Sequence, residues 1–114
     1  MDAITPLLLS KALDGLSARY LATAENIANA NTPNYRPLEV RFEEALRAAA
    51  TDPKALASVT PTTELAPTPR IASEMRLDLE VATASQTAGR YMALVEMLAR
   101  EMQIQRSAIG GDRG

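Results

Sequence analysis

The sequence predicts an all-α protein in which two long helices, one at each end of the chain, form a coiled-coil-like pair. Two observations lead to this prediction. Apolar residues recur at alternating steps of four and three at both ends of the 114-residue chain, and prolines are concentrated between these regions. A short irregular segment and a Pro/Thr-rich linker are expected to join the helices. The chain therefore divides into residues 1–35, 36–70 and 71–114, a length that suits a single domain.

The first predicted helix occupies most of residues 1–35. Its apolar and small residues repeat at steps of four and three, the heptad pattern of a helix that packs against partner helices. Gly15 is unfavourable inside a helix by roughly 1 kcal/mol relative to alanine, but its missing side chain permits close approach of a partner. The repeat is formed by Leu9, Leu13, Leu16, Tyr20, Thr23, Ile27 and Ala30.

The end of this helix is marked by four asparagines within residues 26–34. Asparagine is unfavourable in helix interiors because its side chain competes for nearby backbone groups. Pro33 excludes helical geometry at the residue before it, and Asn34 is one of the few non-glycine residues that tolerate a left-handed turn. The sequence thus predicts a specified exit from the helix, formed by Asn26, Asn29, Asn31, Thr32, Pro33, Asn34 and Tyr35.

The connector, residues 36–70, is predicted to be irregular and partly disordered. Around Phe42 to Ala49 the pattern suggests a short amphipathic helical turn, in which Glu43 and Arg47 are spaced for an ion pair. Residues 51–70 then contain four prolines and five threonines and few apolar groups. Burial of so few apolar groups could not offset the entropy of ordering the chain. No strand-rich insertion is therefore expected in this segment.

The second predicted helix lies in residues 71–114 and carries the longest repeat. Ten positions alternate by four and three without a break, and Gln105 alone among them is polar. A repeat of this length is typical of helices completed by partner helices, whereas the simpler interpretation is an ordinary two-helix hairpin. The sequence leaves both open. The ten positions are Leu77, Val81, Ala84, Ala88, Tyr91, Val95, Leu98, Met102, Gln105 and Ile109.

Composition argues against several classes of function. The chain contains no Cys, His or Trp, which removes the commonest general base, thiolate chemistry and the usual zinc ligands. We therefore expect no catalytic residues, no metal and no cofactor. A net charge of −2 provides no field that would attract nucleic acid. The apolar run Leu7–Leu9 is too short to span a bilayer or to act as a cleavable secretory signal.

The stretch Asn26-Ile27-Ala28-Asn29-Ala30-Asn31-Thr32-Pro33-Asn34-Tyr35-Arg36 closely resembles the N-terminal signature of bacterial flagellar rod, hook and related axial proteins, which runs roughly N-I-A-N-x-x-T-P-G-Y-K. Asn34 stands where that family usually has glycine, and Arg36 where it usually has lysine. Both changes keep the local physics, since asparagine also tolerates left-handed geometry and arginine keeps the charge. The C-terminal segment, from Glu74 through Arg90-Tyr91 to Ile109, resembles that of the proximal rod members of the family.

The resemblance implies a structural role without enzyme activity. Members of the family polymerise through their terminal helices into the rod, the drive shaft between the membrane-embedded motor ring and the hook, around a central export channel. Expected partners are further copies of the chain, other rod proteins, the rod-base adaptor, the surrounding ring and the flagellar type III export apparatus. The expected location is the periplasm-spanning rod of the basal body, reached without a cleavable signal peptide.

The resemblance also gives the repeats a role. The apolar positions would pack between helices of the same or neighbouring subunits, and the signature would fix the angle at which the chain leaves the helical layer and present polar groups to the next subunit. The alternative is a small helical cytosolic regulator or flagellar export chaperone that binds partner helices. The predicted packing residues are Leu9, Leu13, Leu16, Tyr20, Ile27, Leu77, Val81, Tyr91, Val95, Leu98, Met102 and Ile109.

Overall fold

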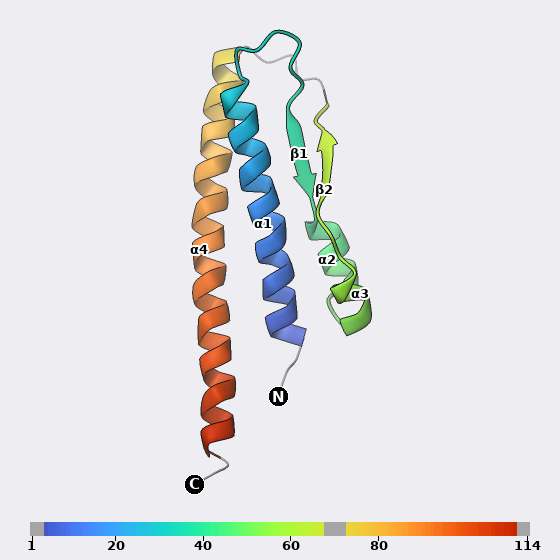
Figure 1. Cartoon of the computed structure of the whole chain (residues 1–114), viewed down its shortest axis with the longest axis vertical. Coiled ribbons are helices and arrows are strands. Elements are labelled where there is room, and N and C mark those ends of the chain that lie inside the picture. Colours follow the sequence, from blue (N-terminus) through green and yellow to red (C-terminus); the bar gives the residue numbers. More distant parts are fainter. Residues whose placement is uncertain (1–3, 68–72, 112–114) are drawn as a thin grey trace.

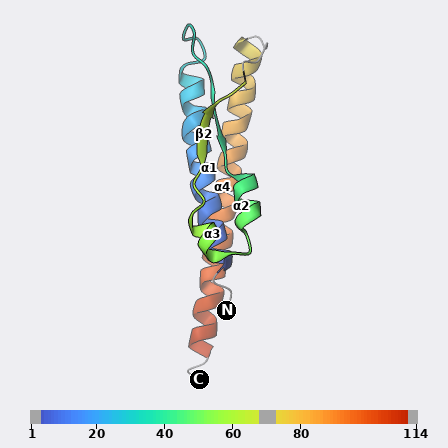
Figure 2. The same cartoon turned by 90° about the vertical axis from the view of Figure 1, so that its right-hand side faces the viewer.

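Two long antiparallel helices form the frame of the molecule. The computed structural model describes residues 4–67 and 73–111, so the ends of all three predicted segments (1–3, 68–72 and 112–114) lie outside the described residues. Helix α1 (Ile4–Ala28) and helix α4 (Ser73–Gly111) lie side by side and run in opposite directions (Figure 1). The longest dimension of the molecule is 64 Å. The last turns of α4 extend past the start of α1, as Figures 1 and 2 show. The prediction of two long terminal helices is thus confirmed.

The all-α prediction is wrong in one respect, because the connector contains a small antiparallel sheet. Strand β1 (Leu38–Arg41) pairs with strand β2 (Thr62–Leu65), with Leu38 opposite Leu65 and Arg41 opposite Thr62. Helix α1 lies between α4 and these two strands (Figure 1). In β1 the apolar residues alternate with charged ones, which gives the sheet an apolar face toward α1.

The prolines that argued against strands lie where a strand needs no amide hydrogen. The backbone of Leu38 and the carbonyl of Val40 bond to side chains of α1, so their partners in β2 direct their own N–H and C=O groups away from β1. Outward-directed backbone groups recur at every second residue of β2. Pro61 and Pro67, which flank the strand, fall at such outward positions. At these outward positions proline loses no ladder hydrogen bond, and it discourages further strand pairing.

Between the strands lie helices α2 (Glu43–Ala49) and α3 (Pro53–Ala57). Asp52 caps α3 by accepting a hydrogen bond from the backbone N–H of Lys54, and Pro53 occupies the first helical position, where its missing N–H costs nothing. Leu56 is completely buried, and the ammonium of Lys11 on α1 donates to the carbonyl of Val59 at 3.1 Å. These contacts hold the connector against α1.

The apolar core lies between α1 and the connector. Phe42 is buried against Gly15, and the ring occupies the space where a Cβ atom at position 15 would lie. Gly15 was expected to permit the close approach of a partner, and the group that approaches it is the Phe42 ring of the same chain. Helix α4 adds little to this core, since Leu94 alone among its described residues packs against it. The core consists of Leu16, Ala22, Val40 and Phe42, with Ala18, Leu38, Leu46 and Leu94 packed around it.

Candidate functional site

Asn26 joins four parts of the structure at the end of α1. Its Nδ2 donates to the carbonyl of Leu38 at 2.8 Å and to Oε2 of Glu80 at 3.2 Å. Its Oδ1 accepts from the N–H of Leu38 and from the hydroxyl of Tyr35, both at 2.8 Å. Asn26 is only 4% exposed, and these four bonds use its full hydrogen-bonding capacity. The side chain therefore fixes β1, the exit turn and α4 relative to α1.

The exit turn is built from short-range hydrogen bonds of the signature residues. Asn29 Nδ2 donates to the carbonyl of Glu25 at 3.0 Å, and the hydroxyl of Thr32 donates to Asn29 Oδ1 at 3.1 Å. Asn34 has a φ of 63°, which places it in the left-handed region and confirms the geometry predicted for it. The sequence motif therefore specifies a turn, because the side chains of Asn29 and Thr32 bond to groups three or four residues away.

Charged groups surround Tyr35 where the exit turn meets α4. Partial burial raises the pKa of Tyr35, and the carboxylates of Glu25 and Glu80 raise it further, while Arg76 acts in the opposite direction. The phenol therefore stays protonated and remains a donor to Asn26. Arg76 also donates to the carbonyl of Ala30 at 2.6 Å, which places a cation on one of the carbonyls that follow the end of α1.

The seven predicted signature residues thus separate into two groups. Four of them form hydrogen bonds within the chain; of these Asn26 is buried, Asn29 and Tyr35 are half-buried and Thr32 is exposed. The other three, Asn31, Pro33 and Asn34, are exposed in the exit turn. A role of the signature in contacts between subunits stays a prediction. The residues with intrachain hydrogen bonds from their side chains are Asn26, Asn29, Thr32 and Tyr35.

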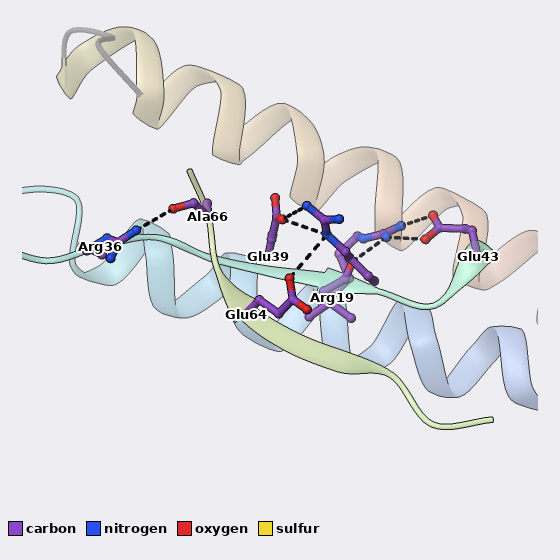
Figure 3. Close-up of polar contacts among 8 residues, drawn as sticks. Arg19, Arg36, Glu39, Glu43, Glu64 and Ala66 are labelled. Carbon is purple, nitrogen blue, oxygen red and sulfur yellow. Dashed lines mark hydrogen bonds and ion pairs between the residues drawn. The ribbon is translucent and has the colours of Figure 1, made fainter. Parts of the chain in front are cut away.

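Arg19 is the main residue that the sequence analysis missed. Its guanidinium donates to both carboxylate oxygens of Glu43 at 2.7 Å and to the carbonyl of Val40 at 2.8 Å, and it lies 4.8 Å from the centre of the Phe42 ring. Figure 3 shows Arg19 reaching from α1 to Glu43 at the start of α2. The expected partner of Glu43 was Arg47, on the same helix. The available signal was that Arg19 lies one turn from Gly15, on the face that receives the connector.

The outer face of the sheet carries a second charged group. Glu39 and Glu64 lie directly opposite each other, and Arg41 offsets their repulsion, with its Nε 2.9 Å from Glu39 and 3.6 Å from Glu64 (Figure 3). The hydrogen bond that Arg41 donates to Glu39 is the largest cause that raises the pKa of Arg41. Because these groups are exposed, the pairs add little stability.

Acid should weaken the contact between Arg19 and Glu43. The hydrogen bond from Arg19 holds the pKa of Glu43 below its ordinary value of 4.5, despite partial desolvation. A carboxylate with a lowered folded-state pKa stabilises the fold above its unfolded-state pKa and loses that contribution as the pH falls through the lowered value. Urea midpoints measured from pH 7 to 3 should therefore decline less below pH 4.5 in Glu43→Gln than in the wild type. Glu44→Gln, a change in the exposed neighbour, is the control; if it flattens the profile equally, the assignment to Glu43 fails.

The exposed apolar side chains of α4 form two rows on roughly opposite faces. The first row continues onto α1 at Tyr20 and Leu21, which face Tyr91 and Met92 across a groove of about 260 Å³. This volume lies below the roughly 300–1,000 Å³ typical of small-molecule sites, and none of the groove's lining residues is charged. The groove therefore suits apolar side chains better than a soluble ligand. The first row is Val81, Met92, Val95 and Met102, and the second is Leu79, Met97 and Ile104.

The predicted packing residues differ in burial within the single chain. In α1, Leu9 and Leu16 are buried, Leu13 and Ile27 are half-buried, and Tyr20 is exposed. Of the seven predicted packing residues in α4, Leu77 and Leu98 are half-buried. The other five remain exposed, so a role between subunits stays a prediction for them. These five are Val81, Tyr91, Val95, Met102 and Ile109.

Comparison with known proteins adds no assignment. No protein-family model matches the chain, and a search of curated proteins found no match. In the part of the chain that the structure describes, no cluster of acidic side chains is placed to hold a metal ion. Within the same ranges, no helix combines the length and apolar character needed to cross a membrane.

Proposed function

We propose that this protein is a structural subunit of the bacterial flagellar basal-body rod, in its proximal part, and that it polymerises through its terminal helices around a central export channel. The resemblance of residues 26–36 to the axial-protein signature supports the choice of family. The structural observation that carries the proposal is the exposure of apolar side chains along two faces of α4. A monomeric protein has no need of such surfaces, whereas an assembling subunit does.

The geometry of the two rows favours an open polymer over a closed dimer. Successive helical residues are rotated by about 100°, so residues two apart, such as Val95 and Met97, point in directions roughly 200° apart. One subunit can therefore contact a first neighbour through one row and a second neighbour through the other. A contact between two different surfaces propagates from subunit to subunit and forms rings or helical filaments.

The remaining parts of the proposal follow from the family resemblance. The subunit would act without catalysis or a cofactor, and its neighbours would be other rod proteins, the rod-base adaptor and the membrane-embedded ring. It would pass through the flagellar type III export apparatus and reside in the periplasm-spanning rod. The two-stranded sheet and the Asn26 corner would hold the connector against α1, which leaves the exposed rows of α4 free for neighbours.

A charge placed in either row should block self-association. We expect the purified protein to form a series of species that grows with concentration in sedimentation velocity. Met92→Asp in the first row, where the native side chain is 70% exposed, and Met97→Asp in the second should each reduce assembly strongly, because each buries a carboxylate in an apolar contact. Ser107→Asp is the matched control: it is exposed on the same helix, lies between the two rows and should assemble normally.

The second measurement asks where the protein resides in cells. A tagged wild-type chain should be recovered in purified flagellar basal bodies, whereas Met92→Asp and Met97→Asp should be absent from them. Recovery from the cytosol, with no basal-body fraction, would instead support the regulator or export chaperone. A wild-type protein that stays monomeric at high concentration would count against polymerisation through α4.

A further inference from the structure

Helix α4 packs along α1, but within residues 76–109 it buries no large apolar side chain of its own. Although it lies along α1, Thr87 is its only buried residue in the range 76–109, at 3% exposure. A buried threonine contributes little hydrophobic stabilisation compared with a buried leucine or phenylalanine. The large apolar side chains of α4 face solvent in the two rows described above. The surface that α4 turns toward α1 therefore consists of Thr87 and half-buried residues such as Ala84, Ala88, Leu94 and Leu98.

The connector is attached to α1 in a different way. Phe42 and Val40 are buried in the core, Leu56 is fully buried, and hydrogen bonds from Arg19, Asn26 and Lys11 reach connector groups. Residues 4–67 thus contain nearly all of the buried apolar side chains, in α1, β1, α2 and α3. Helix α4 meets this core through Leu94, which packs at its margin, and through Thr87 and Ala88, which line the groove beside Leu16.

Polar contacts tie α4 to this unit near the exit turn. Arg76 donates to the carbonyl of Ala30 at 2.6 Å, and Glu80 accepts from Asn26 at 3.2 Å. Both contacts lie in the first turns of α4, so they hold its start while the packing along α1 rests on half-buried residues such as Ala84, Ala88 and Leu98. Loss of this packing would uncover the side of Leu16 that faces α4, but it would leave the contact of Phe42 with Gly15 and the hydrogen bonds between the connector and α1 in place.

We propose that α4 is an opening arm, which separates from α1 as a unit while residues 4–67 stay folded. Segments with few buried apolar contacts open at a lower free energy than the global unfolding transition. The role of this opening in assembly rests on the proposed function. Opening would uncover the residues of α1 and α4 that form the groove, so that a neighbouring copy could bind them. The closed chain is then a monomer whose groove residues are protected. Opening then controls when a subunit becomes competent to assemble.

Hydrogen exchange of the full-length monomer, read by mass spectrometry at low concentration, tests the opening directly. Amides of α4 should exchange about tenfold or more faster than those of α1 residues 9–27, and should do so together as one unit. Equal protection of α1 and α4 would overturn the proposal. This measurement needs no assembly, so its result is independent of whether the rod function is correct.

A crosslink tests whether opening is used. The chain has no cysteine, so Ser17→Cys and Ala88→Cys, on opposite sides of the groove, can be joined by a short bis-maleimide. The crosslinked protein should show α4 protection equal to that of α1 and should lose self-association. The same variant capped with N-ethylmaleimide is the control and should assemble. If the crosslinked protein assembles as well as the capped control, opening has no role in assembly.

Discussion

Replacing Asn26 with alanine should lower the free energy of unfolding by roughly 2–4 kcal/mol. The change removes the partners of the Leu38 N–H, the Leu38 carbonyl and the Tyr35 hydroxyl at once. Each buried polar group left without a partner costs about 1–3 kcal/mol, and partial access of water at the corner reduces the sum. Urea unfolding followed by circular dichroism measures this loss. The attachment of β1 should weaken as well, because Asn26 supplies both hydrogen bonds to the first residue of that strand.

Asn31→Ala is the matched control, since it removes an asparagine of the same stretch that is exposed. Its effect should stay within about 0.5 kcal/mol, as for most surface substitutions. Asn26→Asp gives a further distinction: it keeps the acceptor for Leu38 and Tyr35 but removes both donors and places a carboxylate beside Glu80. It should therefore also destabilise the protein. Equal stability of Asn26→Ala and Asn31→Ala would show that the corner does not depend on Asn26.

Features that depend on nearby residues could be predicted from the sequence. The repeats of apolar residues indicated both long helices, because a helix brings positions three and four apart onto one face. The left-handed turn at Asn34 followed from the proline before it and from the tolerance of asparagine for that geometry. The concentration of asparagines was noticed as well. The role of Asn26 could not be deduced from neighbouring residues, because Asn26 bonds to Leu38, which is twelve residues away.

The sheet and the Arg19 contact could not be predicted because they depend on residues distant in the sequence. Arg19 and Glu43 are 24 residues apart, and no local pattern pairs them. The Pro/Thr-rich composition of residues 51–70 argued for disorder, since prolines usually exclude a strand. In this fold Pro61 and Pro67 fall at outward positions of an edge, where proline loses no hydrogen bond, and position on the edge is set by the register with β1.

The repeat in α4 predicted an apolar surface but not which part of it α1 would cover. Because the apolar residues extend around much of the helix, the period alone leaves the rotation of α4 undetermined. The chain turns Thr87 inward and leaves Val81, Val95 and Met102 exposed. This choice leaves large apolar side chains where a neighbouring chain can reach them. The pattern thus indicated that α4 has apolar surface for packing. Tertiary contacts determined which part of that surface stays exposed in the single chain.

Phe42→Ala should produce a loss of about 3–5 kcal/mol in the free energy of unfolding, the usual cost of removing a large aromatic side chain from a core. Phe42 is buried at the centre of the contact between α1 and the connector, and its ring also supports Arg19. The substitution therefore removes the contact that fixes the start of α2. Thermal and urea unfolding should both show the loss, and a change below about 1 kcal/mol would place the core elsewhere.

Gly15→Ala tests the same contact from the other side through the sign of its effect. Alanine is the better helix former by about 1 kcal/mol, yet its Cβ would overlap the base of the Phe42 ring, and overpacking typically costs about 1–3 kcal/mol. We therefore expect a net loss in the wild-type background and a net gain when Phe42 is already alanine, because the space is then empty. Gly89→Ala on α4, where a Cβ meets nothing within 4 Å, should be stabilising in both backgrounds. A gain from Gly15→Ala in the wild type would mean that the ring moves aside easily, and the tight contact between α1 and the connector would then not limit stability.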